Sequence, residues 1–249
     1  MAVRASITPS RRLFAPRLAE FAQVVCFDQR GPCRSDRGMP EDWTLAQWAD
    51  DIRRLCETLG IERPIVMGSS FGGIVAQAYA TRHPDHPAKL ILHCTTPKFS
   101  LPRIAAKFEQ LGGARAADLA RALWRDPGDP ALLGPYSEVC MPLYNTQRRD
   151  PGLTKDWGIA HAGGVDAFLF VRRRGPPLRL RAAAPPRRLS DSGDGRRGGP
   201  ICPITDSEDI VAALPSGLAR FRRFANCGHG IGWDDPEGFV AAIRDFVLA

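Results

Sequence analysis

Pro64-Ile65-Val66-Met67-Gly68-Ser69-Ser70-Phe71-Gly72-Gly73 is the stretch of this 249-residue chain that decides the fold. It begins with a short apolar run, typical of a strand buried on both faces, and it leads into a helical pattern that ends at Arg82. Between them lies the pattern Gly-x-Ser-x-Gly, in which Gly68 and Gly72 flank Ser70. Glycines at these positions permit so tight a turn that the serine hydroxyl stands clear above the sheet edge. The stretch therefore predicts a reactive serine at the carboxyl end of a buried strand.

Strands and helices alternate on both sides of this turn. The pattern predicts the following elements in the first hundred residues: a helix over 12–21, a strand over 24–27, a helix over 44–59, a strand over 64–67, a helix over 72–82 and a strand over 90–94. Near the end it predicts a helix over 207–214, a strand over 219–225 and a helix over 236–248. Such alternation favours an α/β fold with a mostly parallel sheet flanked by helices.

The middle of the chain departs from this alternation. From Pro97 to about Gly164 the residues form helical pieces broken by Pro, Gly and Asp, with helices expected over 103–111 and 117–123. Because the strand–helix pattern returns afterwards, this part is better explained as an insertion than as a separate domain. We expect one domain over residues 1–249 with a helical cap at about 97–170.

His229 is the candidate base for the serine, and it lies in Cys227-Gly228-His229-Gly230 after the last predicted strand. The flanking glycines let the backbone turn so that the imidazole reaches inward. Its place after Ser70 and before the final helix matches the order nucleophile, acid, histidine that accompanies this type of turn. We expect Ser70 as nucleophile, His229 as general base and acid, and the Phe71 backbone N–H as an oxyanion donor. The other histidines fit this role less well: His83, His86, His93 and His161.

The motifs together resemble a known family. Val24–Gly38, reading VVCFDQRGPCRSDRG, is similar to the Asp-Gln-Arg-Gly-x-Gly-x-Ser-Asp segment of α/β-hydrolases of the prolyl aminopeptidase (proline iminopeptidase) group. Three further motifs resemble the same group: the serine turn at 68–73, the helix end at 76–84 and the Cys-Gly-His-Gly at 227–230. The resemblance implies an α/β-hydrolase fold, an acyl-enzyme on Ser70, no cofactor, and N-terminal prolyl peptides or related amides and esters as substrates.

The chain departs from that family at three places. Cys33 stands where the family motif has its last glycine. The strands and the His-Gly-Gly-type loop that precede the first helix in the family, and that supply a second oxyanion donor, have no counterpart in Met1–Arg11. The triad aspartate precedes Pro200-Ile201-Cys202-Pro203 in the family, so its place here is Gly199, which has no side chain to hold an imidazole. Nearby acids that close no recognisable strand are Asp191, Asp194 and Asp206.

The segment Arg172–Gly199 carries the whole formal charge of +7, because it contains nine Arg and two Asp. Read one base later with permitted codons, Leu189–Gly199 can encode the missing penultimate strand and its aspartate. Our hypothesis is a frameshifted stretch with the frame restored at Pro200, and an N-terminus that is truncated or also shifted. Without that strand, the strand before His229 would have no inner neighbour. The alternatives are a genuine disordered basic loop and a basic arm that binds nucleic acid or membrane. The arm is the weaker of these, because the segment has neither aromatic residues nor an amphipathic period.

Composition excludes several classes of protein. Outside Arg172–Gly199 the acidic and basic residues are equal in number, so a nucleic-acid-coating surface is not expected. No apolar stretch reaches the ~18–20 residues of a membrane helix, and Met1–Phe14 lacks the apolar core of a secretory signal. The seven cysteines form no Cys-x-x-Cys pair, which favours reduced thiols in a cytoplasmic protein over disulfides or a zinc site. We expect no metal, no nucleic-acid partner and no membrane partner.

The function predicted from these features is that of a serine hydrolase, with a small molecule or a short peptide as substrate. Loss of the triad acid costs about 10⁴ in turnover in the serine-protease template, so a poor or inactive enzyme is expected. A prolyl aminopeptidase needs acidic cap residues to bind the substrate ammonium, and the candidates are Glu138, Asp156 and Asp166. The alternatives are a small-molecule esterase or lactonase and a non-catalytic relic that only binds ligands or partners. The sequence does not specify the oligomeric state.

Overall fold

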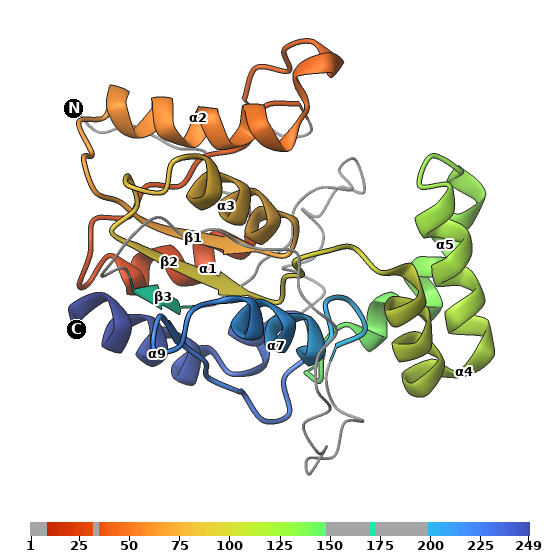
Figure 1. Ribbon diagram of the computed structural model, residues 1–249. Coiled ribbons are helices and arrows are strands. Elements are labelled where there is room, and N and C mark those ends of the chain that lie inside the picture. The colour runs from red at the N-terminus through yellow and green to blue at the C-terminus, as the bar shows by residue number, and fades with distance from the viewer. Residues whose placement is uncertain (1–8, 32–34, 148–169, 173–198) are drawn as a thin grey trace.

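The structure is a computed structural model that describes residues 9–31, 35–147, 170–172 and 199–249 (Figure 1). Its described sheet has four strands in the order β1-β2-β3-β4. The strands are β1 (Ile65–Ser69), β2 (Lys89–His93), β3 (Phe170–Arg172) and β4 (Ala219–Arg220). β1 and β2 are parallel, and their register runs from Ile65 opposite Lys89 to Ser69 opposite His93. The serine turn and the end of β2 therefore lie at the same edge of the sheet.

The predicted parallel pairing is confirmed for β1 and β2, whereas the other two pairings are antiparallel. β3 lies between β2 and β4 and pairs through Phe170 with Ile91 and with Arg220. The expectation that the strand before His229 has no inner neighbour is therefore wrong, because the three residues of β3 occupy that place. Residues 173–198 lie outside the described residues, so the frameshift hypothesis stays a hypothesis.

Helices cover both faces of the sheet (Figure 1). On one face, Ile91 packs with Leu18 of α1 (Pro9–Leu18) and Phe239 of α9 (Pro236–Leu248). On the other, Leu90 and Leu92 pack with α3 (Phe71–Arg82) and α7 (Ile204–Ala213). α2 (Leu45–Thr58) lies outside α3 and packs against it through its apolar stripe. Successive residues of β2 therefore pack alternately against the helices of the two faces, as expected for a strand buried on both faces.

Local signals account for the ends of the helices. Thr44 caps α2, because its hydroxyl accepts a hydrogen bond from the Gln47 N–H at 3.1 Å, and Gly60 follows the helix with φ +66°. Asp235 caps α9 through the Gly238 N–H at 2.9 Å, and Pro236 occupies the first turn. The predicted helices 44–59 and 236–248 are confirmed to within a residue at each end.

The strand predicted at 24–27 is wrong, because residues 22–30 form no strand. β1 is the edge strand of the described sheet, so the apolar run has no strand to extend. It is held by side-chain packing instead: Val24 joins the cluster around Ile65, and Phe27 joins the cluster around Val66. The strand predicted at 219–225 is also shorter than expected, since β4 has two residues.

The cap segment, which we define as Leu101–Leu143, forms a helical layer of its own (Figure 1). It contains α4 (Leu101–Arg125), α5 (Pro130–Val139) and the 3₁₀ turn η2 (Met141–Leu143). α4 kinks at Gly113, where φ is +75°, and its two halves contain the helices predicted at 103–111 and 117–123. The segment lies on the side of the molecule toward which β1 and β2 point. Its role as a cap insertion of one domain stays a prediction.

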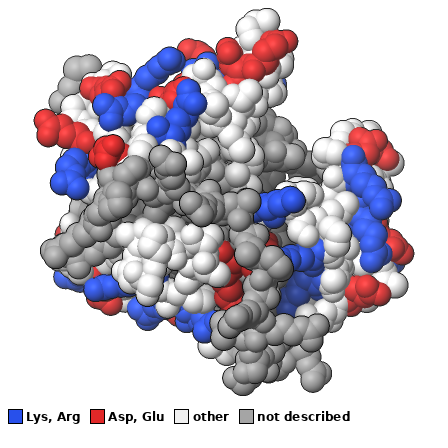
Figure 2. All heavy atoms as spheres, viewed as in Figure 1, with Lys and Arg blue, Asp and Glu red and all other residues white. Residues whose placement is uncertain are grey.

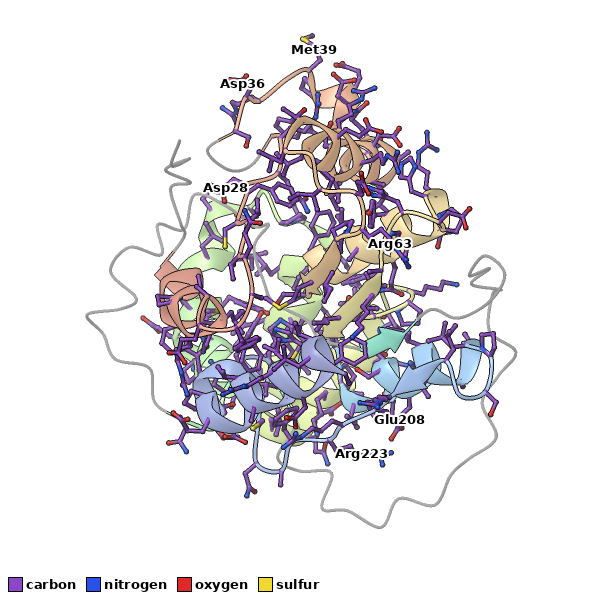
Figure 3. All side chains as sticks on the ribbon, turned by 90° about the vertical axis from the view of Figure 1, so that its left-hand side faces the viewer. Asp28, Asp36, Met39, Arg63, Glu208 and Arg223 are labelled. Atoms are coloured by element: carbon purple, nitrogen blue, oxygen red, sulfur yellow. The ribbon has the colours of Figure 1, made fainter. Side chains whose placement is uncertain are left out.

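The surface carries charges of both signs. On the face shown in Figure 2, the Lys and Arg side chains of the described residues alternate with Asp and Glu over α2 and over the cap segment. Figure 3 shows an ion pair on another part of the surface, between Glu208 of α7 and Arg223, whose side chains are 2.6 Å apart. In the described part of the chain, no helix is both long and apolar enough to cross a membrane.

Candidate active site

Ser70 forms the sharp turn that the sequence predicts. β1 ends at Ser69 and α3 begins at Phe71, and between them Ser70 has φ +46° and ψ −117°. A positive φ is unusual for a residue with a side chain, and it is the strained conformation expected for a nucleophile elbow. The residue is only 7% exposed. The turn therefore has the predicted geometry, but the side chain is covered rather than clear of its surroundings.

Two glycines near Ser70 are required by close packing. A Cβ at Gly68 would lie 2.4 Å from the Gly72 carbonyl oxygen and 2.7 Å from the Ala76 Cβ, and one at Gly73 would lie 2.5 Å from the Thr95 Oγ1. At Gly72, in contrast, a Cβ would meet no described atom within 4 Å. The sequence predicted that the tight turn requires glycine at positions 68 and 72. The structure shows that packing requires glycine at positions 68 and 73 instead.

The elbow is fixed by hydrogen bonds to its backbone. The Thr95 hydroxyl donates to the Ser70 carbonyl at 2.7 Å, and the Ser70 N–H points to the His93 carbonyl at 3.4 Å. Phe71 is the first residue of α3, so its N–H has no acceptor within the helix. An N–H at that position, at the positive end of the helix dipole, is suited to stabilise an oxyanion on a substrate bound at Ser70.

His229 is buried, with 3% exposure, and its ring is held by a backbone carbonyl. Nδ1 lies 2.8 Å from the Ile201 carbonyl oxygen. A carbonyl can only accept, so Nδ1 is the donor in this bond and carries the proton of a neutral ring. Nε2 is then the basic nitrogen. The carbonyl thus selects the tautomer that a general base needs, which is the orienting role of the carboxylate in a catalytic triad.

Gly199, the expected place of the triad acid, does lie against His229. A Cβ there would be 2.4 Å from the His229 backbone nitrogen and 3.0 Å from the Tyr144 carbonyl oxygen. No side chain fits without displacement of backbone. Gly199 therefore lies beside His229 as expected from the sequence, but a carboxylate cannot be added there in this arrangement.

Asp206, one of the three nearby acids, does not replace it. Asp206 is buried, and its carboxylate accepts from Arg103 at 2.8 Å. Burial raises the pKa of Asp206, against the opposing effect of its bond to Arg103. This ion pair joins α7 to α4. Asp191 and Asp194 lie outside the described residues.

Cys202 is the neighbour of Ser70 that the sequence analysis missed. Burial raises the pKa of its thiol to about 12, and the nearby Ser70 hydroxyl opposes this increase. The preceding residue, Ile201, holds His229. Two consecutive residues therefore lie beside the predicted groups, Ile201 at the base and Cys202 near the nucleophile. The only signal in the sequence was the position of Cys202 directly after the expected acid strand.

His93 lies beneath this site, at the end of β2. It is 3% exposed and packs edge-on against Phe239, with ring centroids 5.2 Å apart. Burial, and to a lesser extent the nearby His229, lowers its pKa well below the ordinary value. His93 is therefore a neutral ring of the core at neutral pH, as its position inside a predicted strand suggested.

Of the residues proposed to bind a substrate ammonium, the structure describes Glu138, which is exposed on α5. Asp156 and Asp166 lie outside the described residues. In the described ranges, no three metal-ligating side chains come together and no two cysteines form a disulfide. The described residues thus present a serine, a histidine and backbone groups as the chemically useful set.

Substitution of Gly199 by aspartate is expected to give no gain in activity. The new Cβ would collide with the His229 backbone, and overpacking of this kind costs about 1–3 kcal/mol of folding stability. Urea denaturation and ester hydrolysis of G199D measure the two effects. Gly134→Asp is the control, because no described atom lies within 4 Å of a Cβ there. Higher turnover in G199D would contradict this prediction and would restore Gly199 as the place of a functional acid.

A sheet covered by helices, with a strained serine between strand and helix and a buried histidine after the last strand, defines the class of α/β hydrolases. The family described as "alpha/beta hydrolase fold" matches residues 6–162, and the chain belongs to this family. The α/β-hydrolase fold expected from the sequence is therefore confirmed.

Several curated proteins are similar to this chain. A protein of Caulobacter sp. (strain K31) named "Putative carbamate hydrolase RutD" is 28% identical over 232 residues, which cover 90% of this chain and 80% of the relative. The protein of the same name from Enterobacter cloacae subsp. cloacae is 29% identical over 231 residues, covering 82% and 85%. These relatives favour hydrolase chemistry without fixing the substrate of this chain.

Two solved structures share the fold. Proline iminopeptidase of Mycobacterium smegmatis aligns with a TM-score of 0.61 at 18% identity, and covers 97% of this chain and 86% of its own. The esterase EaEST of Exiguobacterium antarcticum aligns with a TM-score of 0.60 at 17% identity, covering 100% and 90%. At this identity they support the fold alone.

Proposed function

We propose that this protein is a serine hydrolase that cleaves small carbamates and esters through an acyl-enzyme on Ser70. The observation that supports the proposal is that the elbow and the histidine loop both contact the end of β2. The Ser70 N–H points to the His93 carbonyl, and the Cys94 thiol donates to the carbonyl of Gly228, the residue before His229. The His229 ring donates from Nδ1 to the Ile201 carbonyl, which leaves Nε2 as the nitrogen that can accept a proton. A hydroxyl is a weak nucleophile until a base accepts its proton, and we assign that role to His229 Nε2.

The reaction follows from these groups. Ser70 Oγ attacks the substrate carbonyl carbon while its proton passes to His229 Nε2, and the new oxyanion is stabilised by the Phe71 N–H. The His229 proton then goes to the leaving oxygen or nitrogen as its bond to carbon breaks. Water attacks the acyl-enzyme, His229 accepts its proton, and Ser70 leaves with that proton. Because the imidazolium faces a carbonyl rather than a carboxylate, we expect slow turnover.

The small-molecule substrate class is favoured over prolyl peptides by two observations. The curated relatives carry the name of a carbamate hydrolase. The acidic side chains of the described cap segment lie at its outside, Glu138 among them, or cap a helix, as Asp129 does through the Ala131 N–H at 2.9 Å. A peptidase that removes N-terminal proline needs a buried acid for the ammonium. The motif resemblance at 24–38 still makes prolyl aminopeptidase activity the second candidate.

A substrate panel tests the proposal. Wild-type protein is incubated with p-nitrophenyl acetate, with a small N-alkyl carbamate ester of p-nitrophenol and with prolyl-naphthylamide, and a fluorophosphonate probe reports an activated serine. We expect turnover of the first two and labelling of Ser70, identified by peptide mass spectrometry. Turnover of prolyl-naphthylamide alone would overturn the substrate class. No turnover and no labelling would support a non-catalytic binding protein.

A further inference from the structure

The loop that carries His229 is fastened to a segment that the sequence did not assign to the site. This segment, Tyr144–Gln147, follows the cap segment, and we call it the clasp. The His229 N–H donates to the Tyr144 carbonyl at 2.6 Å, and the Gly230 N–H donates to the Asn145 Oδ1 at 2.8 Å. The clasp therefore binds the backbone on both sides of the His229 side chain.

Asp234 ties the clasp and the histidine loop to each other. Its carboxylate accepts from the Gly228 N–H at 2.6 Å and from the Gln147 N–H at 2.9 Å. The Thr146 hydroxyl adds a bond to the Asn226 carbonyl at 2.5 Å. Bonds from backbone N–H groups to a carboxylate are among the stronger hydrogen bonds of proteins, so the loop is held at several consecutive residues.

The glycines beside His229 make this contact possible. A Cβ at Gly228 would lie 2.1 Å from the Tyr144 carbonyl oxygen, and one at Gly230 would lie 2.7 Å from the Asn145 Oδ1. The sequence analysis gave both glycines a role in turning the chain inward. The structure shows that each also leaves room for the clasp.

The clasp contacts the imidazole itself as well. The Tyr144 ring stands edge-on to the His229 ring, with centroids 5.6 Å apart and an interplanar angle of 89°. The Tyr144 hydroxyl is in turn 2.8 Å from the Tyr136 hydroxyl on α5. Tyr144 thus packs against the His229 ring, and a hydrogen bond to α5 of the cap segment holds Tyr144 in place.

We propose that Asn145 is a positioning residue that holds His229 in register with Ser70. The proposal rests on the function proposed above. In a triad, a carboxylate holds the ring; here the acceptor at Nδ1 is the Ile201 carbonyl, so the placement of the ring depends on the backbone that carries it. Asn145 fixes that backbone at Gly230, next to His229. A shift of about 1 Å in a reacting group can cost 10²-fold in rate.

Three variants test the proposal. Asn145→Leu removes the acceptor at nearly constant size, Asn145→Asp keeps an oxygen for the Gly230 N–H, and Gln147→Leu is the matched control, because only its backbone takes part in the clasp. We expect kcat for p-nitrophenyl acetate to fall about 10- to 100-fold in N145L with little change in KM, to recover largely in N145D, and to stay unchanged in Q147L. Unchanged kcat in N145L, or equal losses in N145L and N145D, would overturn the proposal.

A second readout does not need turnover. In protein labelled with ¹⁵N-histidine, the ring nitrogens of His229, assigned by their absence in His229→Gln, report the tautomer. We expect the Nδ1–H form in wild type, N145D and Q147L, and a mixture of tautomers in N145L. The tautomer can be measured even if the wild-type protein is inactive. The experiment therefore distinguishes an error in the assignment of Asn145 from an error in the proposed function. A wild-type tautomer in N145L would overturn the clasp proposal.

If N145L does not fold, Asn145→Ala takes its place. It also removes the acceptor of the Gly230 N–H, but it introduces no bulky apolar side chain. We expect kcat to fall about 10- to 100-fold, as in N145L. Wild-type kcat together with a wild-type His229 tautomer in a folded N145A would overturn the proposal.

Discussion

Replacement of Ser70 by alanine is expected to reduce hydrolysis of p-nitrophenyl acetate to the rate without enzyme and to abolish labelling by a fluorophosphonate. The bond to the acyl group forms at Ser70 Oγ, so its removal leaves no nucleophile, and in the subtilisin template loss of the nucleophile costs about 10⁶ in turnover. The elbow itself is expected to persist in the variant, because the Thr95 hydroxyl and the Gly73 N–H both bind the Ser70 carbonyl, which alanine retains.

Ser69 provides the control for this experiment. Its hydroxyl belongs to the preceding residue, is buried, and has no hydrogen-bond partner among the described residues. Ser69→Ala removes a hydroxyl from the same turn and is expected to retain both labelling and turnover, since loss of an unsatisfied buried hydroxyl is close to neutral for stability. Equal labelling of wild type and S70A would show that another residue reacts with the probe and would contradict the assignment of Ser70.

Phe108→Ala is expected to cost about 3–5 kcal/mol of folding stability, the largest loss from a single core side chain that we predict. Phe108 is fully buried on α4 and packs with Tyr136, Tyr144 and Ile201. Removal of its ring leaves a cavity in the middle of this cluster. Because Ile201 and Tyr144 both hold His229, kcat is expected to fall together with stability.

Urea denaturation at constant pH measures this effect, and Phe99→Ala is the matched control. Phe99 is 48% exposed, so the same change of side chain there is expected to cost less than about 1 kcal/mol. If F108A loses no more folding stability than F99A, the cluster around Phe108 does not stabilise the fold. A normal kcat in a destabilised F108A would show that the cluster does not influence the active site.

The sequence predicted the parts of the fold that depend on local signals. The run 64–73 carries its own strand, turn and helix, and Thr44, Asp235 and Pro236 mark helix ends through bonds within a few residues. The strand at 24–27 failed because an apolar run becomes a strand only where a neighbouring strand supplies backbone partners. β1 is the edge of the described sheet, and the run packs by side chains instead.

The same distinction between local signals and long-range contacts applies to the residues of the candidate site. Ser70, Phe71 and His229 are predicted because turn glycines and chain order mark them. Cys202 and Asn145 were missed, since each lies near parts of the chain that are more than 80 residues away in sequence. Gly199 was expected to leave His229 without an orienting partner, whereas the Ile201 carbonyl accepts from its ring. A backbone acceptor has no signature in a sequence, because every residue carries one.

The burial of Ser70 has a consequence for the kinetic constants. The residue is only 7% exposed, so we expect a substrate carbonyl to reach the serine oxygen only in the open fraction of molecules, in which the covering side chains have moved aside. When only the open fraction binds, the apparent affinity is the intrinsic affinity multiplied by that fraction. A smaller side chain at position 202 would raise the open fraction and lower KM, while the intrinsic chemistry at Ser70 stayed the same.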